Sequence, residues 1–232
     1  MSRMFTVDGH RVKTFNPVTG CHGPEGKGPC VYCFAKMLAE GKLADTPKYR
    51  DCGFKPTYHP KVFEKDLGRN NIYFVCDMGD LWGDWVPNNW IQDVWRKCAS
   101  ADASNVFWFL TKNPSRYLRF LIENGLYPRS NFVFGVTSER DDGNRILPML
   151  ALIGTFPDTH TFVSMEPIMD FDAERMISWL SRLQPEFIYI GYDSGNHHLP
   201  EPPLEKVEAL ISTLQNAGKI EVRRKLLRRA RE

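Results

Sequence analysis

Short apolar runs alternate along most of the chain with segments whose large apolar residues recur at helical spacing. The runs have strand length, and an amphipathic segment follows each of them. The expected strands are residues 12–18, 71–76, 106–111, 131–137, 161–166 and 187–191. The expected helices are residues 33–40, 87–101, 113–125, 146–153, 172–183 and 204–218. The pattern therefore predicts six strand–helix units in one α/β chain.

The apolar strands indicate a parallel sheet that is buried on both faces and joined by right-handed crossovers. At 232 residues the chain is shorter than a complete eightfold barrel of about 250 residues. We therefore predict a partial (β/α)6 TIM-like barrel, with an open doubly wound sheet as the alternative. We expect a single domain over residues 1–232, with a proline-containing crossover insertion at about 44–70 and a basic tail at 219–232.

Composition and charge add little about partners except at the C-terminal end. The hydrophobic content of 42% and charged content of 25% are ordinary for a globular protein, and the net charge is only +2. The tail at 219–232, however, carries seven Lys and Arg residues against two Glu. This basic tail could contact the phosphates of a nucleic acid. Alternatively it could form a helix-like terminus that docks through Leu226 and Leu227 and keeps its charges in solvent, and we favour this second interpretation.

The cellular location follows from the cysteines and from what the chain lacks. Six cysteines without a recognisable signal peptide predict a reducing, cytoplasmic location. No apolar run approaches the roughly 20 residues that a membrane helix needs, so we expect no membrane partner.

Three of the six cysteines fall in one short segment. Cys30 and Cys33 form a Cys-x-x-Cys pair, and Cys21 precedes them across a loop rich in Gly and Pro that can fold back on itself. Three thiolates without an obvious fourth protein ligand predict a metal centre with one open position. A zinc site with His22 as its fourth ligand and a set of unliganded cysteines are the alternatives.

Polar residues follow each expected strand at its carboxyl end, where the sites of α/β proteins lie. Together they predict the rim of a cavity that faces the cysteine loop. These residues are Cys21, Asp77, Asp80, Thr111, Lys112, Thr137, Ser138, Glu139, Ser164, Glu166, Asp193 and Ser194.

The cysteine segment resembles the signature of the radical S-adenosylmethionine (radical SAM) superfamily, in which an aromatic residue precedes the last cysteine, as Tyr32 does here. Eight residues separate Cys21 from Cys30, whereas three is the common spacing. With Asn16-Pro17 and Phe34-Ala35, the Cys-x8-Cys-x2-Cys motif is similar to an uncharacterised phage-associated radical-SAM-like branch. The similarity extends from about residue 14 to residue 195.

The resemblance implies a [4Fe–4S] cluster on Cys21, Cys30 and Cys33 and S-adenosylmethionine (SAM) as a second cofactor. It implies an enzyme that reductively cleaves SAM to a 5′-deoxyadenosyl radical, which abstracts hydrogen from an unknown substrate. A low-potential electron donor of the flavodoxin or ferredoxin type would be its partner. The residues expected to contact the cofactor are Tyr32, Met78, Gly79, Asp80, Lys112, Thr137 and Glu166.

Two other classes of protein stay open. The chain could be a non-catalytic iron–sulfur or zinc protein that binds a nucleic acid or a protein, or a non-redox α/β enzyme with structural cysteines. Of the other cysteines, Cys76 and Cys98 are expected to be buried bystanders, and Cys52 lies in the insertion. His197 and His198 follow the sixth expected strand, where they either line the mouth of the site or lie in a solvated loop; we favour the solvated loop.

Overall fold

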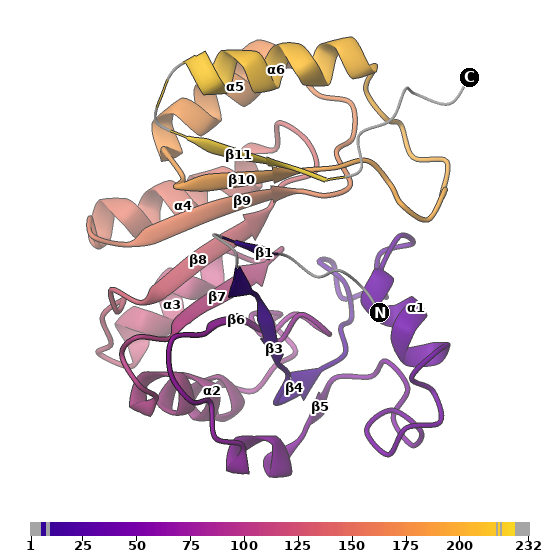
Figure 1. Cartoon of the computed structure of the whole chain (residues 1–232), viewed down its shortest axis with the longest axis vertical. Helices are drawn as coiled ribbons and strands as arrows, with labels where there is room; N and C mark the ends of the chain where they lie inside the picture. Colours follow the sequence, from indigo (N-terminus) through magenta and orange to yellow (C-terminus); the bar gives the residue numbers. More distant parts are fainter. Residues whose placement is uncertain (1–5, 8–9, 217, 219, 226–232) are drawn as a thin grey trace. The chain divides into compact units, whose positions relative to one another are not determined.

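The computed structural model describes residues 6–7, 10–216, 218 and 220–225. It is a mixed α/β protein with two compact units, Met1–Val133 and Phe134–Glu232. Each unit contains hydrogen-bonded strands and helices, which are labelled in Figure 1. All six expected strands and all six expected helices are present, so the predicted α/β class is confirmed.

In the first unit, three parallel strands run in the order β3-β6-β7. The strands are β3 (Lys13–Phe15), β6 (Ile72–Val75) and β7 (Val106–Thr111), and the helices are α1 (Phe34–Glu40), α2 (Asn88–Ser100) and α3 (Ser115–Glu123). A short antiparallel pair, β1 (Thr6–Val7) and β2 (His10–Arg11), precedes them. Trp82 lies at the centre of the aromatic core, with its ring against Phe109, Tyr117 and Phe120.

The expected first strand at 12–18 is divided in two. β3 ends at Phe15, and β4 (Val18–Thr19) begins after Pro17, whose nitrogen has no hydrogen to donate to a ladder. β4 pairs antiparallel with β5 (Thr57–Tyr58), which is followed by the 3-10 helix η1 (Pro60–Glu64). The insertion at about 44–70 therefore contains regular elements that its prolines concealed.

The second unit continues the alternation of strands and helices. Its strands are β8 (Phe132–Thr137), which begins two residues before the unit boundary, β9 (His160–Met165), β10 (Phe187–Ile190) and β11 (Glu221–Arg224). Its helices are α4 (Gly143–Thr155), α5 (Ala173–Leu183) and α6 (Leu204–Asn216). α4 begins earlier than its apolar spacing predicts, because the Asp142 side chain caps it by accepting a hydrogen bond from the Asn144 amide.

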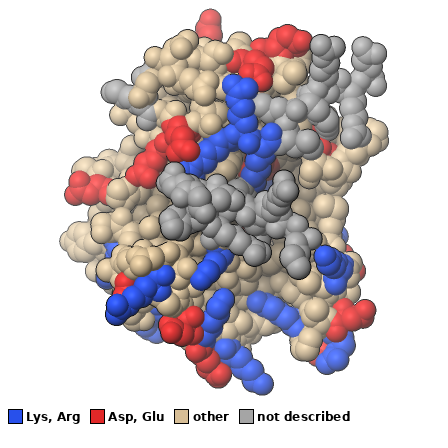
Figure 2. Space-filling model, in the orientation of Figure 1, with Lys and Arg blue, Asp and Glu red and all other residues tan. Residues whose placement is uncertain are grey.

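The basic tail is not helix-like where the structure describes it, so that expectation was wrong. Residues 221–224 form the edge strand β11, parallel to β10. Arg223 pairs with Glu221, Arg224 with Glu208 and Lys225 with Glu166. On the face drawn in Figure 2, basic side chains of the second unit gather beside acidic ones. Leu226, Leu227 and the rest of the tail lie outside the described residues.

Within the described part of the chain, no helix combines the length and hydropathy that a membrane span requires.

Candidate functional site

Cys21 is held between the end of β6 and the insertion. The Gly20 amide donates to the Met78 carbonyl (2.9 Å), and the Cys21 amide donates to the Phe54 carbonyl (3.3 Å). Gly20 and Gly79 also form a parallel β-bridge. The cysteine segment thus begins against the turn that follows β6, as its place after the first strand predicts.

This attachment requires glycine on both sides. A β-carbon on Gly79 would lie 2.6 Å from the Gly20 oxygen, and one on Gly20, whose φ is +84°, would lie 2.2 Å from the Lys55 oxygen. Both obstacles are backbone atoms, which cannot rotate away as a side chain can. The Gly of Thr19-Gly20-Cys21 and the Gly of Met78-Gly79-Asp80 therefore form one close backbone contact.

Beyond Cys21 the loop folds back on itself. The Gly28 amide donates to the His22 carbonyl (2.7 Å), and the Gly23 amide donates to the Cys21 sulfur (3.1 Å). A tight turn follows, in which the Cys33 amide donates to the Cys30 carbonyl (3.0 Å). The Cys33 sulfur then caps α1 by accepting from the Lys36 amide (3.4 Å).

Burial shifts the pKa of two thiols of this loop. Burial, aided by Asp80, Cys33 and Cys30, raises the pKa of Cys21 to about 12. Burial, aided by Cys30, also raises the pKa of Cys33. In the described part of the chain, however, no three or more His, Cys, Asp or Glu side chains are arranged as a ready metal site. The loop therefore carries the three cysteines on one folded-back segment, but their thiols do not form a preformed metal site.

His22, the candidate fourth zinc ligand, is exposed and packs its ring edge-on against Trp85, with 5.6 Å between centroids. The remaining cysteines differ in burial as predicted. Cys76 and Cys98 are buried, whereas Cys52 is half-buried with its thiol hydrogen-bonded to the Lys48 carbonyl.

Asp80 holds the turn after β6 to the end of β7. Its buried carboxylate accepts hydrogen bonds from the Thr111 hydroxyl (2.7 Å), the Lys112 amide (3.0 Å) and the Trp82 amide (3.0 Å). Burial raises its pKa, although these hydrogen bonds oppose the rise. Both carboxylate oxygens therefore already have protein partners.

Lys112 connects β7 with the cysteine loop. Its ammonium donates a hydrogen bond to the Tyr32 hydroxyl (2.8 Å) and lies 4.9 Å from the centre of the Tyr32 ring. Met78 is buried in the cluster that Cys21 and Cys33 also contact. The first unit thus brings five of the seven expected cofactor residues, Tyr32, Met78, Gly79, Asp80 and Lys112, to the same region as the cysteines.

The other two expected cofactor residues belong to the second unit. Thr137 is buried at the end of β8. Glu166 pairs with the Lys225 ammonium (2.8 Å) and accepts a hydrogen bond from the Ser164 hydroxyl (3.2 Å). Both residues lie at the carboxyl ends of their strands, as expected.

Asn16 joins three segments in a way that the sequence analysis did not foresee. Its side chain donates to Asp77 (2.6 Å) and accepts from the Met78 amide (3.3 Å), and its carbonyl accepts from the Lys48 ammonium (2.6 Å). Burial raises the pKa of Asp77 to about 6. The Asn16-Pro17 pair was the sequence signal that could have predicted these contacts, because an Asn side-chain amide can both donate and accept hydrogen bonds.

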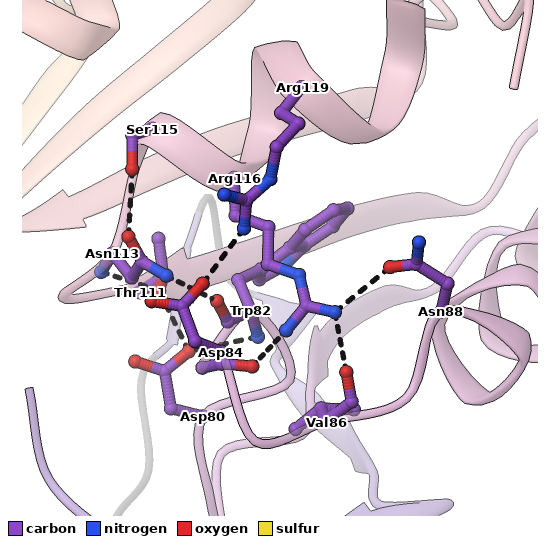
Figure 3. Close-up of polar contacts among 11 residues, drawn as sticks. Asp80, Trp82, Asp84, Val86, Asn88, Thr111, Asn113, Ser115, Arg116 and Arg119 are labelled. Atoms are coloured by element: carbon purple, nitrogen blue, oxygen red, sulfur yellow. Dashed lines mark hydrogen bonds and ion pairs between the residues drawn. The ribbon is translucent and has the colours of Figure 1, made fainter. Parts of the chain in front are cut away.

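Arg116 fixes the loop between β6 and α2, which was also missed. Its buried guanidinium donates to the carbonyls of Gly83 and Val86 and to the Asn88 side chain, as Figure 3 shows. In the same view Arg119 pairs with Asp84. In the sequence of an amphipathic helix, an Arg that will be buried looks the same as an Arg that will face solvent.

The pairing of the expected rim residue Asp193 with His197, after β10, was also not foreseen. The Asp193 carboxylate, 5% exposed, pairs with Nδ1 of His197 (2.8 Å) and accepts the amides of Gly195 (2.9 Å) and His197. The imidazole lies against Gly195, where a β-carbon would be 2.0 Å from the ring. His197 is therefore an ordered side chain with a carboxylate partner, whereas the sequence indicated a solvated loop.

Comparison with known proteins identifies one family. The sequence pattern of the family described as "Protein of unknown function (DUF5131)" matches residues 9–204, which include every candidate residue above. No curated protein and no solved structure matches the chain.

Proposed function

We propose that this chain, which belongs to the DUF5131 family of proteins of unknown function, is a radical SAM enzyme. Cys21, Cys30 and Cys33 would hold a [4Fe–4S] cluster, and SAM would be the second cofactor. One observation carries the proposal: Cys21, Cys30 and Cys33 lie on one loop that folds back on itself and begins against the turn after β6. Within the mixed α/β class, we propose the more specific fold of a partial (β/α)6 barrel of the radical SAM type.

The donor set supports an iron–sulfur cluster over a closed zinc site. A structural zinc needs four protein ligands, and the only neighbouring candidate in the motif, His22, packs on Trp85 instead. Burial disfavours free thiolates at Cys21 and Cys33, and a bound cation would offset that cost. The amides of Gly23 and Lys36 already donate to the Cys21 and Cys33 sulfurs, and such hydrogen bonds tune the potential of a cluster.

When bound and reduced, the cluster would supply the electron that cleaves SAM to methionine and a 5′-deoxyadenosyl radical. The residues of the chain would bind and orient the reactants and exclude water. The Lys112 ammonium can pair with the carboxylate of SAM if it turns from Tyr32, and the Tyr32 ring offers a flat face to the adenine. Asp80 would act indirectly, by holding the Met78-Gly79 turn whose backbone faces the cysteine loop.

The test is anaerobic reconstitution with iron and sulfide. The expected result is ~4 irons per chain and a brown protein with absorption near 400 nm. Cys21→Ser, Cys30→Ser and Cys33→Ser should each lose the cluster, whereas the matched Cys52→Ser variant should keep it.

The dithionite-reduced protein should then release methionine and 5′-deoxyadenosine from SAM, which chromatography detects. A stable cluster without SAM cleavage would reject the enzyme and favour a non-catalytic iron–sulfur protein. Stoichiometric zinc without iron would reject the cluster as well.

A further inference from the structure

The loop that follows β10 holds a histidine against a buried carboxylate. Oδ1 of Asp193 accepts hydrogen bonds from Nδ1 of His197 (2.8 Å) and from the Gly195 amide (2.9 Å), and Oδ2 accepts from the His197 amide. The Asp193 amide in turn donates to the Glu201 carboxylate (2.9 Å). The carboxylate is thus fixed by the same segment of backbone whose imidazole it orients.

The charge of Asp193 decides which nitrogen of the imidazole carries the proton. Burial alone would raise the pKa of the Asp193 carboxyl, but hydrogen bonds from His197 and Gly195 outweigh burial and lower this pKa below its usual range. An ionised carboxylate only accepts hydrogen bonds, so Nδ1 of His197 is the donor. In the neutral imidazole the lone pair therefore lies on Nε2.

Nε2 of His197 is open to solvent. The His197 side chain is 20% exposed, against 4% for the Asp193 side chain. Within the described part of the chain no group forms a hydrogen bond with Nε2, and Nε2 is not among the buried polar atoms that lack a partner. A solute can therefore reach the lone pair while the opposite side of the ring stays held.

The backbone around His197 adopts uncommon conformations to hold the ring there. Asn196 and His198, on either side of it, have φ of +58° and +54°, in the left-handed region that residues with a β-carbon seldom occupy. Gly195 passes so close to the imidazole that a β-carbon would lie 2.0 Å from Cε1. Strained residues of this kind persist where the surrounding structure over-determines them, and they gather at functional sites.

The pair also occupies the place where α/β proteins carry catalytic residues. β10 ends at Ile190, and Asp193 and His197 follow in the loop at its carboxyl end, where such sites lie. His160 provides a contrast within the same unit. It pairs with Glu186, but it begins β9 at the amino end, and both side chains are exposed.

We propose that His197 is a general base, whose Nε2 accepts a proton from a substrate with a weakly acidic O–H or C–H bond, and that Asp193 is its positioning residue. In this step the bond to hydrogen breaks, its electron pair stays on the substrate, and the proton binds the Nε2 lone pair to give imidazolium. The Asp193 carboxylate stabilises that cation and stays ionised. The proposal does not depend on a group held by the cysteines, because both residues belong to the second unit.

The test uses the purified full chain and 5-nitrobenzisoxazole, a probe whose reaction needs only a base. The C–H proton of the probe passes to the base, the C–H electron pair completes a nitrile, and the N–O bond breaks to release a coloured phenolate, which absorbance follows. His197→Gln removes the base. His160→Gln is the matched control, because it removes an imidazole that also has a carboxylate partner.

We expect His197→Gln to lose at least ~10-fold in kcat/KM, which is less than the usual contribution of a positioned base, about 10²–10⁴, because the probe is not the natural substrate. The His160→Gln control should stay within about twofold of wild type, because a half-solvated imidazole is not positioned for proton transfer.

Asp193→Asn separates orientation of the imidazole from simple support of the loop. An Asn side chain can donate to Nδ1 and so favour the tautomer that carries the proton on Nε2, which cannot accept the proton of the probe. Nitrogen NMR of His197 should show a protonated Nδ1 in wild type and a protonated Nε2 in this variant. The variant should also lose at least ~10-fold in kcat/KM.

A wild-type rate no higher than that of His197→Gln would overturn the proposal. So would NMR of the wild type that places the proton of the neutral imidazole on Nε2, a measurement that stands even if a substituted chain fails to fold. An equal loss in His160→Gln would overturn it as well, because the activity would then belong to surface imidazoles in general. None of these readouts involves iron, so failure of the proposed function would leave this test unaffected.

Discussion

Replacing Gly79 by Ala tests whether the backbone contact between the cysteine loop and β6 is as close as the structure has it. The new β-carbon would lie 2.6 Å from the Gly20 oxygen and 2.8 Å from the Gly20 nitrogen. Real β-carbons essentially never approach another atom within 3.0 Å, so the segments must separate by about 0.4 Å or more. Because both obstacles are backbone atoms, the loop has to move as a whole.

Overpacking of this kind costs about 1–3 kcal/mol. For a chain of this size each kcal/mol lowers Tm by about 2–4 °C, so Gly79→Ala should lower Tm by about 2–12 °C. Because Gly20 adjoins Cys21, the variant should also bind less iron after reconstitution. Calorimetry and an iron assay measure the two effects.

The matched control is Gly154→Ala in α4, where an added β-carbon meets no atom within 4 Å. Alanine is favoured over glycine in a helix by about 0.5–1 kcal/mol, so this variant should be as stable as wild type or slightly more stable. If Gly79→Ala kept the wild-type Tm and iron content, the close contact and the reasoning from it would be refuted.

Three further predictions concern polar groups. Burial raises the pKa of Asp77 from 3.8 to about 6, so the folded chain holds this proton more tightly than the unfolded chain, and the free energy of unfolding should fall as pH rises from about 4 to 6. In urea unfolding at several pH values, Asp77→Asn should remove up to ~3 kcal/mol of that fall. Parallel curves of unfolding free energy against pH for the two proteins would contradict this. In a double-mutant cycle, Lys112→Met and Tyr32→Phe should show a coupling of about 0.5–1.5 kcal/mol, and additive effects would mean that their hydrogen bond contributes nothing. Gly195→Ala should displace the His197 imidazole and abolish the NMR signal of its proton shared with the neighbouring carboxylate, and a signal identical to that of wild type would contradict the packing.

The alternation of apolar runs and amphipathic segments was sufficient to predict six of the described strands and all six described α-helices, although the first expected strand proved to be divided. It was insufficient where local chemistry decides the structure. α4 begins at a capping carboxylate, Asp142, and not at its first apolar residue. β11 was missed because its sequence, Glu-Val-Arg-Arg, looks like a charged tail; only pairing with β10 makes it a strand.

The sequence also indicated which residues of the candidate site lie together in the first unit, because motif spacing and strand ends are properties of the chain order. It did not indicate how they contact one another. The hydrogen bond between Lys112 and Tyr32 joins residues 80 positions apart, and Asn16 contacts Asp77 across 61 positions. Such pairings depend on the tertiary fold, so no local pattern predicts them.

The position of β11 changes how the basic C-terminal residues should be studied. Truncation at residue 219 would strip an edge strand from β10 and remove the cationic partners of Glu166 and Glu208. A shortened protein that lost affinity for RNA or DNA would therefore report damage to the sheet as readily as loss of phosphate contacts. Charge-neutral replacements such as Arg224→Gln, which leave the backbone ladder intact, are the sound way to ask what this end of the polypeptide recognises.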